Sequence, residues 1–178
     1  MSASLKPLTV KEFLDWERSQ EPRYEFDGIQ PVAMTGGSRA HNRITTRLTG
    51  ALVSIVKPPC EACGPDLKVL TPGRVRYPDA SVVCNEANDD DNADIVAPTV
   101  VFEVLSPSTA LTDRRVKAVE YAGVPTIMAY VMLETDRPEI TVRRRSTGWE
   151  AETIAGLEAE LLLPEIEVTI PLATIYAR

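Results

Sequence analysis

The chain has few of the residues that mark secreted, membrane or metal-cluster proteins. Its 178 residues include three cysteines and one histidine, and aromatic residues make up only 6%. An odd number of cysteines argues against a disulfide framework. No apolar run approaches the roughly 20 residues that a membrane-spanning helix needs. Residues 1–7 also lack the apolar segment of a signal peptide. These absences predict a cytoplasmic protein that does not associate with a membrane.

The cysteines include one Cys-x-x-Cys pair, formed by Cys60 and Cys63. A structural zinc site needs four ligands, and with no second pair only Cys84 and His41 remain to complete a set. A thioredoxin-like motif would lie where a strand meets a helix, whereas here two prolines precede the pair and Gly-Pro follows it. We therefore expect incidental loop or strand cysteines without metal or redox chemistry.

Positive charge is also scarce. The chain has 19 Lys and Arg residues against 26 Asp and Glu residues, which gives a net charge of −7. A protein that coats nucleic acid is usually basic. A nuclease is still compatible with this charge, because acidic residues hold a metal ion and the metal then meets the phosphate. The acidic balance predicts weak binding to DNA.

Length and composition predict a single domain over residues 1–178. Hydrophobic residues are 44% and charged residues 25% of the chain, which is ordinary for a globular protein. A chain of this length has no room for a second sizeable core. The sequence shows no internal repeat and no linker.

The N-terminal third predicts a helix, a hairpin and a second helix. Thr9 and Glu12 form a capping box at the start of a helix over residues 9–19. The Asp27-Gly28 pair predicts a hairpin over residues 24–34, in which Pro31 favours an edge strand. A second helix begins at Ser38 or His41, and its apolar stripe is Ile44, Leu48, Ala51, Leu52 and Ile55.

The remainder reads mainly as strands. We expect β-type runs at residues 67–70, 75–84, 99–105 and 127–133, a short helix at 113–122, a hairpin over 140–153 and an extended tail over 161–175. Residues 85–94 read as a solvated acidic loop, because the spacing does not fit a calcium loop. The fold predicted is α/β in the broad sense (α+β): a central mixed β-sheet flanked by helices, with an N-terminal helix and β-hairpin.

Two acidic residues stand on neighbouring β-type segments. Asp79 follows Tyr77-Pro78, and Glu103 lies in the run 99–105, which is apolar enough to be buried on both faces. A buried carboxylate is costly unless it is paired or bound to metal. If the two strands are adjacent, both carboxylates and the backbone carbonyl of Val104 converge on one point. Mg²⁺ favours such oxygen ligands together with water and phosphate oxygens.

A lysine follows these acids on the predicted short helix. Lys117 lies four residues after Asp113 and four before Tyr121, so the three share one helix face. If this face turns toward the acids, the ammonium can orient a water molecule or stabilise a transition state. The alternative is a surface ion pair between Asp113 and Lys117, worth about 0.3–0.5 kcal/mol.

These motifs resemble the Uma family of endonuclease-like proteins, within the restriction-endonuclease-like PD-(D/E)XK superfamily. The resemblance covers most of the chain, from about residue 9 to residue 149. It rests on three stretches: Tyr-Pro-Asp-Ala-Ser-Val-Val at 77–83, Phe-Glu-Val-Leu-Ser-Pro-Ser-Thr at 102–109, and the helix face of Asp113, Lys117 and Tyr121. Segments 23–28 and 38–41 resemble the family's N-terminal hairpin and the entry to its first long helix.

The resemblance implies a Mg²⁺-dependent endonuclease acting on DNA, with Mn²⁺ as a substitute metal. Asp79 and Glu103 would hold the metal and Lys117 would be the catalytic lysine. Glu25 would be an accessory acid, and His41 would lie at the edge of the site. The third motif position holds Leu105 instead of lysine, so this assignment moves the lysine onto the helix. A small nuclease with one site would act as a homodimer to cut both strands.

Two questions stay open from the sequence. The same fold without activity would act as a binding or assembly module. Three consecutive arginines at 143–145 fit either phosphate contacts or a solvated edge that blocks strand pairing. Arg114 and Arg115 flank the proposed site and are the better candidates for contacts to a DNA backbone.

Overall fold

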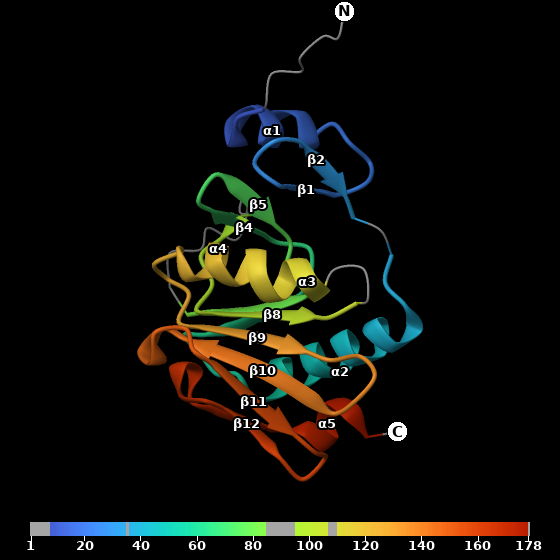
Figure 1. The fold of residues 1–178 in the computed structure, drawn as a ribbon, viewed down its shortest axis with the longest axis vertical. Helices are drawn as coiled ribbons and strands as arrows, with labels where there is room; N and C mark the ends of the chain where they lie inside the picture. Colours follow the sequence, from blue (N-terminus) through green and yellow to red (C-terminus); the bar gives the residue numbers. More distant parts are fainter. Residues whose placement is uncertain (1–7, 35, 85–94, 107–109, 178) are drawn as a thin grey trace, which may run out of the picture.

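The computed structural model describes residues 8–34, 36–84, 95–106 and 110–177. Figure 1 shows a small N-terminal region above a larger sheet, with the C-terminal segments below it. The α-helices are α1 (Val10–Glu17), α2 (Arg39–Ile55), α3 (Ala110–Thr112), α4 (Ala118–Ala122) and α5 (Leu172–Tyr176). The strands are β1 (Tyr24–Phe26), β2 (Pro31–Ala33), β3 (Glu61–Cys63), β4 (Lys68–Thr71), β5 (Arg74–Arg76), β6 (Ala80–Val83), β7 (Ile95–Val96), β8 (Val100–Val104), β9 (Ala129–Leu133), β10 (Glu139–Arg144), β11 (Ala151–Ala155), β12 (Glu160–Leu163) and β13 (Val168–Pro171).

The strands form three sheets. A five-stranded sheet has the order β2-β1-β5-β4-β7, and a six-stranded sheet has the order β11-β10-β9-β8-β6-β3. Strands β12 and β13 pair separately. In the six-stranded sheet β8 is parallel to β9 and antiparallel to β6. The predicted α+β fold with mixed sheets and flanking helices is confirmed.

The N-terminal elements form as their sequence predicts. The Thr9 hydroxyl accepts a hydrogen bond from the Glu12 amide, and the Glu12 side chain accepts one from the Thr9 amide, which completes the capping box of α1. Strands β1 and β2 are the antiparallel hairpin. Gly28 supplies the positive φ of 91° that its turn requires. Strand β2, which begins at Pro31, is an edge strand.

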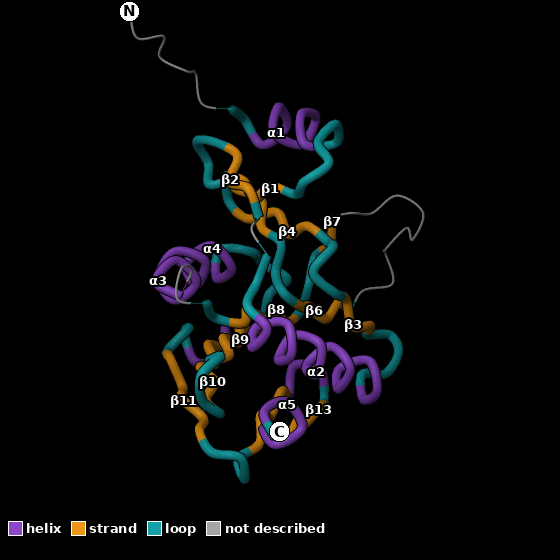
Figure 2. Tube along the Cα trace, turned by 90° about the vertical axis from the view of Figure 1, so that its right-hand side faces the viewer, coloured by secondary structure: helices purple, strands orange, loops and turns teal. Residues whose placement is uncertain are grey.

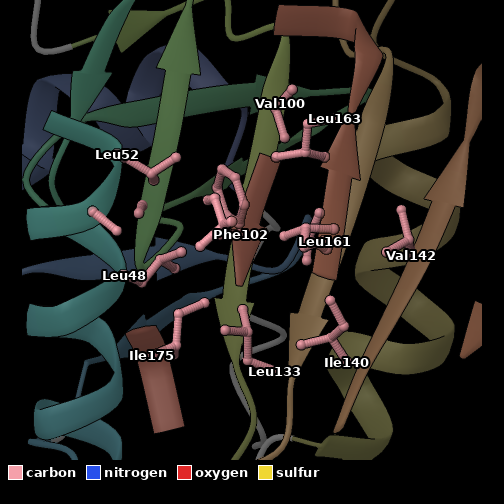
Figure 3. Packing of buried hydrophobic residues seen from close by; sticks show 14 of the residues in the cluster. Leu48, Leu52, Val100, Phe102, Leu133, Ile140, Val142, Leu161, Leu163 and Ile175 are labelled. Carbon is pink, nitrogen blue, oxygen red and sulfur yellow. The ribbon is translucent and has the colours of Figure 1, made fainter. Parts of the chain in front are cut away.

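The two faces of the six-stranded sheet are covered by different helices. Figure 2 shows α2 on one side of β8 and β9, and α3 and α4 on the other. Helix α2 and the C-terminal segments enclose the larger apolar core, which Figure 3 shows around Leu48, Leu52, Phe102, Leu133 and Ile175. The predicted stripe of α2 is buried through Ile44, Leu48, Ala51 and Leu52. Alternate residues of β8 therefore face opposite layers.

Three sequence expectations need correction. The run 75–84 is split between β5 and β6, which lie in different sheets, because Pro78 interrupts the ladder between them. The helix expected at 113–122 begins at Ala110 and contains a π-helical turn, Asp113–Lys117, between α3 and α4. The tail is not wholly extended, since α5 forms after Pro171, a residue suited to a helix start.

The expectation of incidental cysteines is also wrong. Cys60 and Cys84 form a disulfide, with their Cα atoms 3.9 Å apart. Strands β3 and β6 are antiparallel with Glu61 opposite Val83, so the next positions outward bring these cysteines face to face. Cys63 is free and buried. The sequence could not show this pairing, because it depends on the register of strands that are distant in the chain.

Some expectations fall outside the described residues. They include the acidic loop at 85–94, the absence of a signal peptide at 1–7 and the last three residues of the motif at 102–109. Across the described ranges, no helix combines the length and apolar character that crossing a bilayer requires. That the chain forms a single domain stays a prediction.

Candidate active site

The pairing of β6 with β8 places the two predicted acids together. Ala80 lies opposite Phe102, so continuing the register by one residue sets Asp79 opposite Glu103. Directly opposite residues of an antiparallel pair project from the same face of a sheet. Glu103 is on the face of β8 that α3 and α4 cover, the same face as Val101 and Leu105. The adjacency that the sequence argument required is therefore present.

Asp79 is fixed by a backbone amide and by the chain's one histidine. Its Oδ2 atom accepts a hydrogen bond from the Val104 amide at 2.7 Å and lies 3.2 Å from Nε2 of His41. His41 is in the first turn of α2, which Ser38 caps. The hydrogen bond to Asp79 raises the pKa of His41 against the opposing effect of burial, and Asp113 and the Val104 backbone raise it further. His41 therefore contacts one of the two predicted acids, and its place at the edge of the site stays a prediction.

Lys117 lies among three carboxylates. Its Nζ atom is 2.9 Å from Oε1 of Glu103, 3.0 Å from Oε1 of Glu25 and 3.3 Å from Oδ1 of Asp113. The Tyr121 hydroxyl donates a hydrogen bond to the same Glu103 oxygen at 2.9 Å. Lys117 is buried, with 6% of its surface exposed. The structure thus excludes the surface ion pair that the sequence left open for Asp113 and Lys117.

The π-helical turn explains how one helix supplies these groups. A π turn widens the helix by one residue and is frequent at functional sites. Here it runs from Asp113 to Lys117, and both of these end residues are buried. The Tyr130 hydroxyl, which comes from β9, donates a hydrogen bond to the Asp113 carbonyl at 3.2 Å. The turn therefore directs Asp113 and Lys117 inward, and the next α-helical turn adds Tyr121.

The electrostatics of this cluster are dominated by burial and by an excess of acids. Burial raises the pKa of Glu103, the Lys117 ammonium opposes this, and Asp79, Asp113 and Glu25 raise it again, to about 8. Burial lowers the pKa of Lys117, but Glu103, Glu25 and Asp113 outweigh burial and hold it above its ordinary value. Lys117 therefore stays protonated. Three carboxylates, those of Glu25, Glu103 and Asp113, therefore share one ammonium.

A second layer of charges supports Glu25. The Arg76 guanidinium donates to Oε2 of Glu25 at 3.0 Å, and the Tyr77 amide donates to its Oε1 at 3.3 Å. Arg76 also donates two hydrogen bonds to Glu120 at 2.7 and 2.9 Å. Arg74 pairs with the same carboxylate. This chain of ion pairs joins β5, β1 and α4, and it fixes the acid that faces Lys117.

This second layer of charges was not predicted from the sequence. Its one local signal was that Arg74 and Arg76 alternate in a β-type run directly before Tyr77-Pro78-Asp79. Their partner Glu120 is 44 residues from Arg76. No short-range spacing predicts a pairing over that separation.

A further buried network, also unpredicted, holds the residue that precedes Pro78. The Tyr77 hydroxyl donates a hydrogen bond to Glu17 at the end of α1. The Lys68 ammonium, from β4, lies 2.9 Å from the other oxygen of Glu17. All three side chains are buried. This network anchors α1 and β4 to the segment that leads to Asp79.

The three consecutive arginines stabilise the fold. Arg143 donates to the carbonyl of Trp149 at 2.8 Å, and Arg144 donates to the carbonyl of Leu162 at 2.6 Å. Arg145 donates to the Val124 and Ile127 carbonyls at 2.6 and 3.0 Å. These contacts match neither phosphate binding nor a solvated edge, the two roles that the sequence left open for this stretch.

Of the two arginines expected beside the site, Arg114 forms an ion pair with Glu134. Arg115 is exposed on the π-helical turn. Of the two, the exposed Arg115 is the better placed for a contact with a DNA backbone, and this role stays a prediction.

Acids on two adjacent strands, with a lysine from the covering helix, over a mixed sheet define a nuclease-like fold. The chain belongs to the Uma2 family, whose model is described as "Putative restriction endonuclease" and matches residues 10–173. An uncharacterized protein of Synechocystis sp. is 33% identical over 148 residues, covering 82% of this chain and 78% of that protein. A second uncharacterized Synechocystis protein is 28% identical over 137 residues, covering 74% and 77%.

A solved structure shares the fold. The crystal structure of "a putative nuclease belonging to DUF820" from Anabaena variabilis superposes with a TM-score of 0.80 at 20% identity. The match covers 95% of this chain and 97% of the other. The predicted family and the predicted fold are both confirmed.

Proposed function

We propose that this protein is a metal-dependent endonuclease that hydrolyses phosphodiester bonds in DNA. Asp79 and Glu103, with the Val104 carbonyl, hold Mg²⁺, and Lys117 assists the attacking water. One observation carries the proposal. The buried Lys117 ammonium lies 2.9 Å from a carboxylate oxygen of Glu103, and the strand that holds Glu103 pairs with the strand that follows Asp79. Membership of a family of restriction-endonuclease-like proteins supports it.

The residues present fit a divalent cation in their chemistry. Mg²⁺ takes hard oxygen ligands and needs only one or two carboxylates beside water and phosphate oxygens, and Mn²⁺ takes the same ligands. Oδ1 of Asp113 is buried without a hydrogen-bond partner, although it lies 3.3 Å from the Lys117 ammonium. Burial and neighbouring acids raise the pKa of Glu103, so added positive charge would favour its ionised form. When bound, the cation would lower the pKa of a water molecule and neutralise charge on the phosphate.

Each neighbouring residue then has a defined task. The Lys117 ammonium is held at three carboxylates, and it orients the attacking water and stabilises charge that develops on the phosphoryl oxygens. Glu25 acts as an accessory acid by fixing that ammonium. Tyr121 fixes Glu103 through its hydroxyl, and His41 fixes Asp79. A homodimer of such single-site subunits would place two sites on one DNA.

A second candidate is a non-catalytic module of the same fold. Among the described residues, no group of three or more His, Cys, Asp or Glu side chains is arranged to hold a metal ion. The third motif position is Leu105. If metal binding fails, these two observations favour a binding or assembly role.

The test is calorimetric titration of Mn²⁺ into the wild-type protein, Asp79→Asn and Glu103→Gln. Glu158→Gln is the matched control, because Glu158 is exposed in the turn after β11, the far edge strand of the six-stranded sheet. We expect the wild type and the control to bind Mn²⁺ and to cleave DNA. Both site variants should lose the binding and the cleavage. No binding to the wild type would overturn the metal mechanism. Binding without cleavage of any DNA would favour the module.

A further inference from the structure

A cavity of about 490 Å³ opens beside the proposed reacting centre. It lies between the β1–β2 hairpin and the helix that contains the π turn. Glu25, Asp113 and Lys117 of the candidate site form one side of it. Its volume is in the range of pockets that hold a single small ligand.

The outer wall of this cavity is apolar and open to solvent. Ile29 and Val32 from the hairpin and Val116 from the π turn line it, with exposed fractions of 65%, 43% and 40%. Single exposed aliphatic residues are ordinary, but these three border one cavity from two separate elements. Together they form a surface suited to the flat face of a nucleobase.

The polar end of the cavity is neutral overall and well fixed. The lining includes three cations and three acids, and the acids are Glu25, Asp27 and Asp113. Oδ1 of Asp27 accepts hydrogen bonds from the Ile29 and Gln30 amides, both at 2.8 Å. Arg74 is 35% exposed and packs against Gly28, where a Cβ atom would lie 3.3 Å from its Nε. Such a lining is balanced in charge, whereas a site for an anion alone would be strongly positive.

The charge of the whole chain also argues against tight binding to continuous duplex. Affinity for continuous duplex comes mainly from many phosphate contacts by Lys and Arg, but the net charge here is −7. Arg143, Arg144 and Arg145 are engaged with protein carbonyls. A base packed against apolar side chains supplies affinity without such contacts, through the apolar area that it buries.

We propose that this cavity binds one unstacked base next to the phosphate that is cut, so that unpaired DNA is preferred over continuous duplex. The inference rests on the proposed function and deepens it by naming the substrate class. A base inside a duplex cannot enter a pocket of this size without leaving the stack. Single strands, flaps and bubbles provide such a base at little cost.

The first experiment measures binding without any cleavage. Deoxyadenosine 5′-monophosphate is titrated into the protein with labelled Ile and Val methyl groups, and deoxyribose 5-phosphate is the matched probe without a base. We expect the methyl signals of Ile29, Val32 and Val116 to shift with the nucleotide only. Val119, which is 73% exposed on α4 and outside the lining, is the internal control. Equal shifts with both probes, or none with the nucleotide, would overturn the base site.

The second experiment measures cleavage of one sequence as a single strand, as a duplex and as single strands with one abasic position scanned along them. We expect kcat/KM to be about tenfold lower for the duplex and for one abasic position, because the apolar contact of the base with the cavity is then lost. Val32→Ser should lose the abasic effect, and Val119→Ser should keep it. Equal cleavage of intact and abasic strands would overturn the inference and leave the nuclease proposal standing. Nucleotide-dependent shifts with no cleavage of any DNA would support the base site and overturn the nuclease.

Discussion

The two faces of the six-stranded sheet differ in what they bury. The face under α2 packs into the larger apolar core, with Phe102 and Val104 of β8 in it. The face under α3 and α4 includes Glu103, only one residue away in the same strand, beside Lys117 and Tyr121. Apolar burial stabilises a fold, whereas buried ion pairs contribute little net stability but leave large costs when one partner is removed. One face therefore holds the sheet together, and the other contains the residues of the proposed site.

The largest effect on stability should come from the apolar face. Phe102→Ala removes a side chain that is 0% exposed, and such truncations typically cost about 3–5 kcal/mol. Unfolding in urea measures this loss. The control is Leu162→Ala, which alters a residue that is 58% exposed and should change stability by less than about 0.5 kcal/mol. Equal losses for the two variants would contradict the division between the faces.

The polar face should show its largest effect in activity. Lys117→Met removes the ammonium while keeping the length of the side chain, and we expect kcat on DNA to fall by about 10²–10³-fold, as when other transition-state donors are removed. Steady-state cleavage with Mn²⁺ measures it. Lys57→Met changes an exposed lysine and should leave kcat unchanged. If Lys117→Met cleaved at the wild-type rate in folded form, Lys117 would have no part in the reaction.

The same two faces show how far the sequence predicts the structure. The α2 stripe and the buried run 99–105 follow from periodicity alone, and both are present. The separation of β5 from β6 and the π turn were not predicted, because each depends on tertiary packing more than on local propensity. The short helix α5 was missed because two prolines made its segment read as extended.

The candidate site was predictable only where its residues lie in short motifs. Asp79, Glu103 and Lys117 each lie within a short motif, so spacing and family resemblance singled them out, and their roles stay predictions. Arg76 and Glu120 are joined only by the fold, with 44 residues between them. The disulfide between Cys60 and Cys84 likewise depends on strand register, with a separation of 24 residues. Local patterns found what lies within one element, and pairings between distant elements needed the structure.

A smaller effect concerns the second charge layer and its dependence on pH. Burial works against ionisation of Glu120, but the hydrogen bonds from Arg76 and then Arg74 outweigh it, so its pKa is lowered from 4.5. A lowered folded-state pKa contributes stability that is present above the unfolded value and lost as pH falls through the folded value. Glu120→Gln should therefore destabilise the protein at pH 7, by roughly 1–3 kcal/mol.

The measurement for Glu120 is the free energy of unfolding of wild type and Glu120→Gln between pH 7 and pH 3. The difference should shrink as pH falls below 4.5, the ordinary pKa of this carboxyl. Glu158→Gln, an exposed change, should show no such trend. A difference that stayed constant over this range would mean that Glu120 acts through packing instead of charge.

The smallest effect concerns the contact between His41 and Asp79. A Cβ atom on Gly37 would lie 2.7 Å from Nδ1 of His41, whereas one on Gly36 would meet nothing within 4 Å. Gly37→Ala should therefore displace the imidazole from Asp79, and Gly36→Ala should not. The hydrogen bond to Asp79 is the main cause that raises the pKa of His41, so its loss should bring that pKa down toward the ordinary value of 6.5.

Because the chain has one histidine, a single imidazole signal in a proton NMR titration reports this shift without ambiguity. A raised folded-state pKa contributes stability that is fully present below the unfolded pKa and lost as pH rises through the folded value. Gly37→Ala should accordingly be less stable than Gly36→Ala below pH 6, and the gap should narrow above the wild-type pKa. If both variants kept the wild-type titration, the contact between His41 and Asp79 would not depend on the space that Gly37 leaves, and the position of His41 would have to be set by α2 alone.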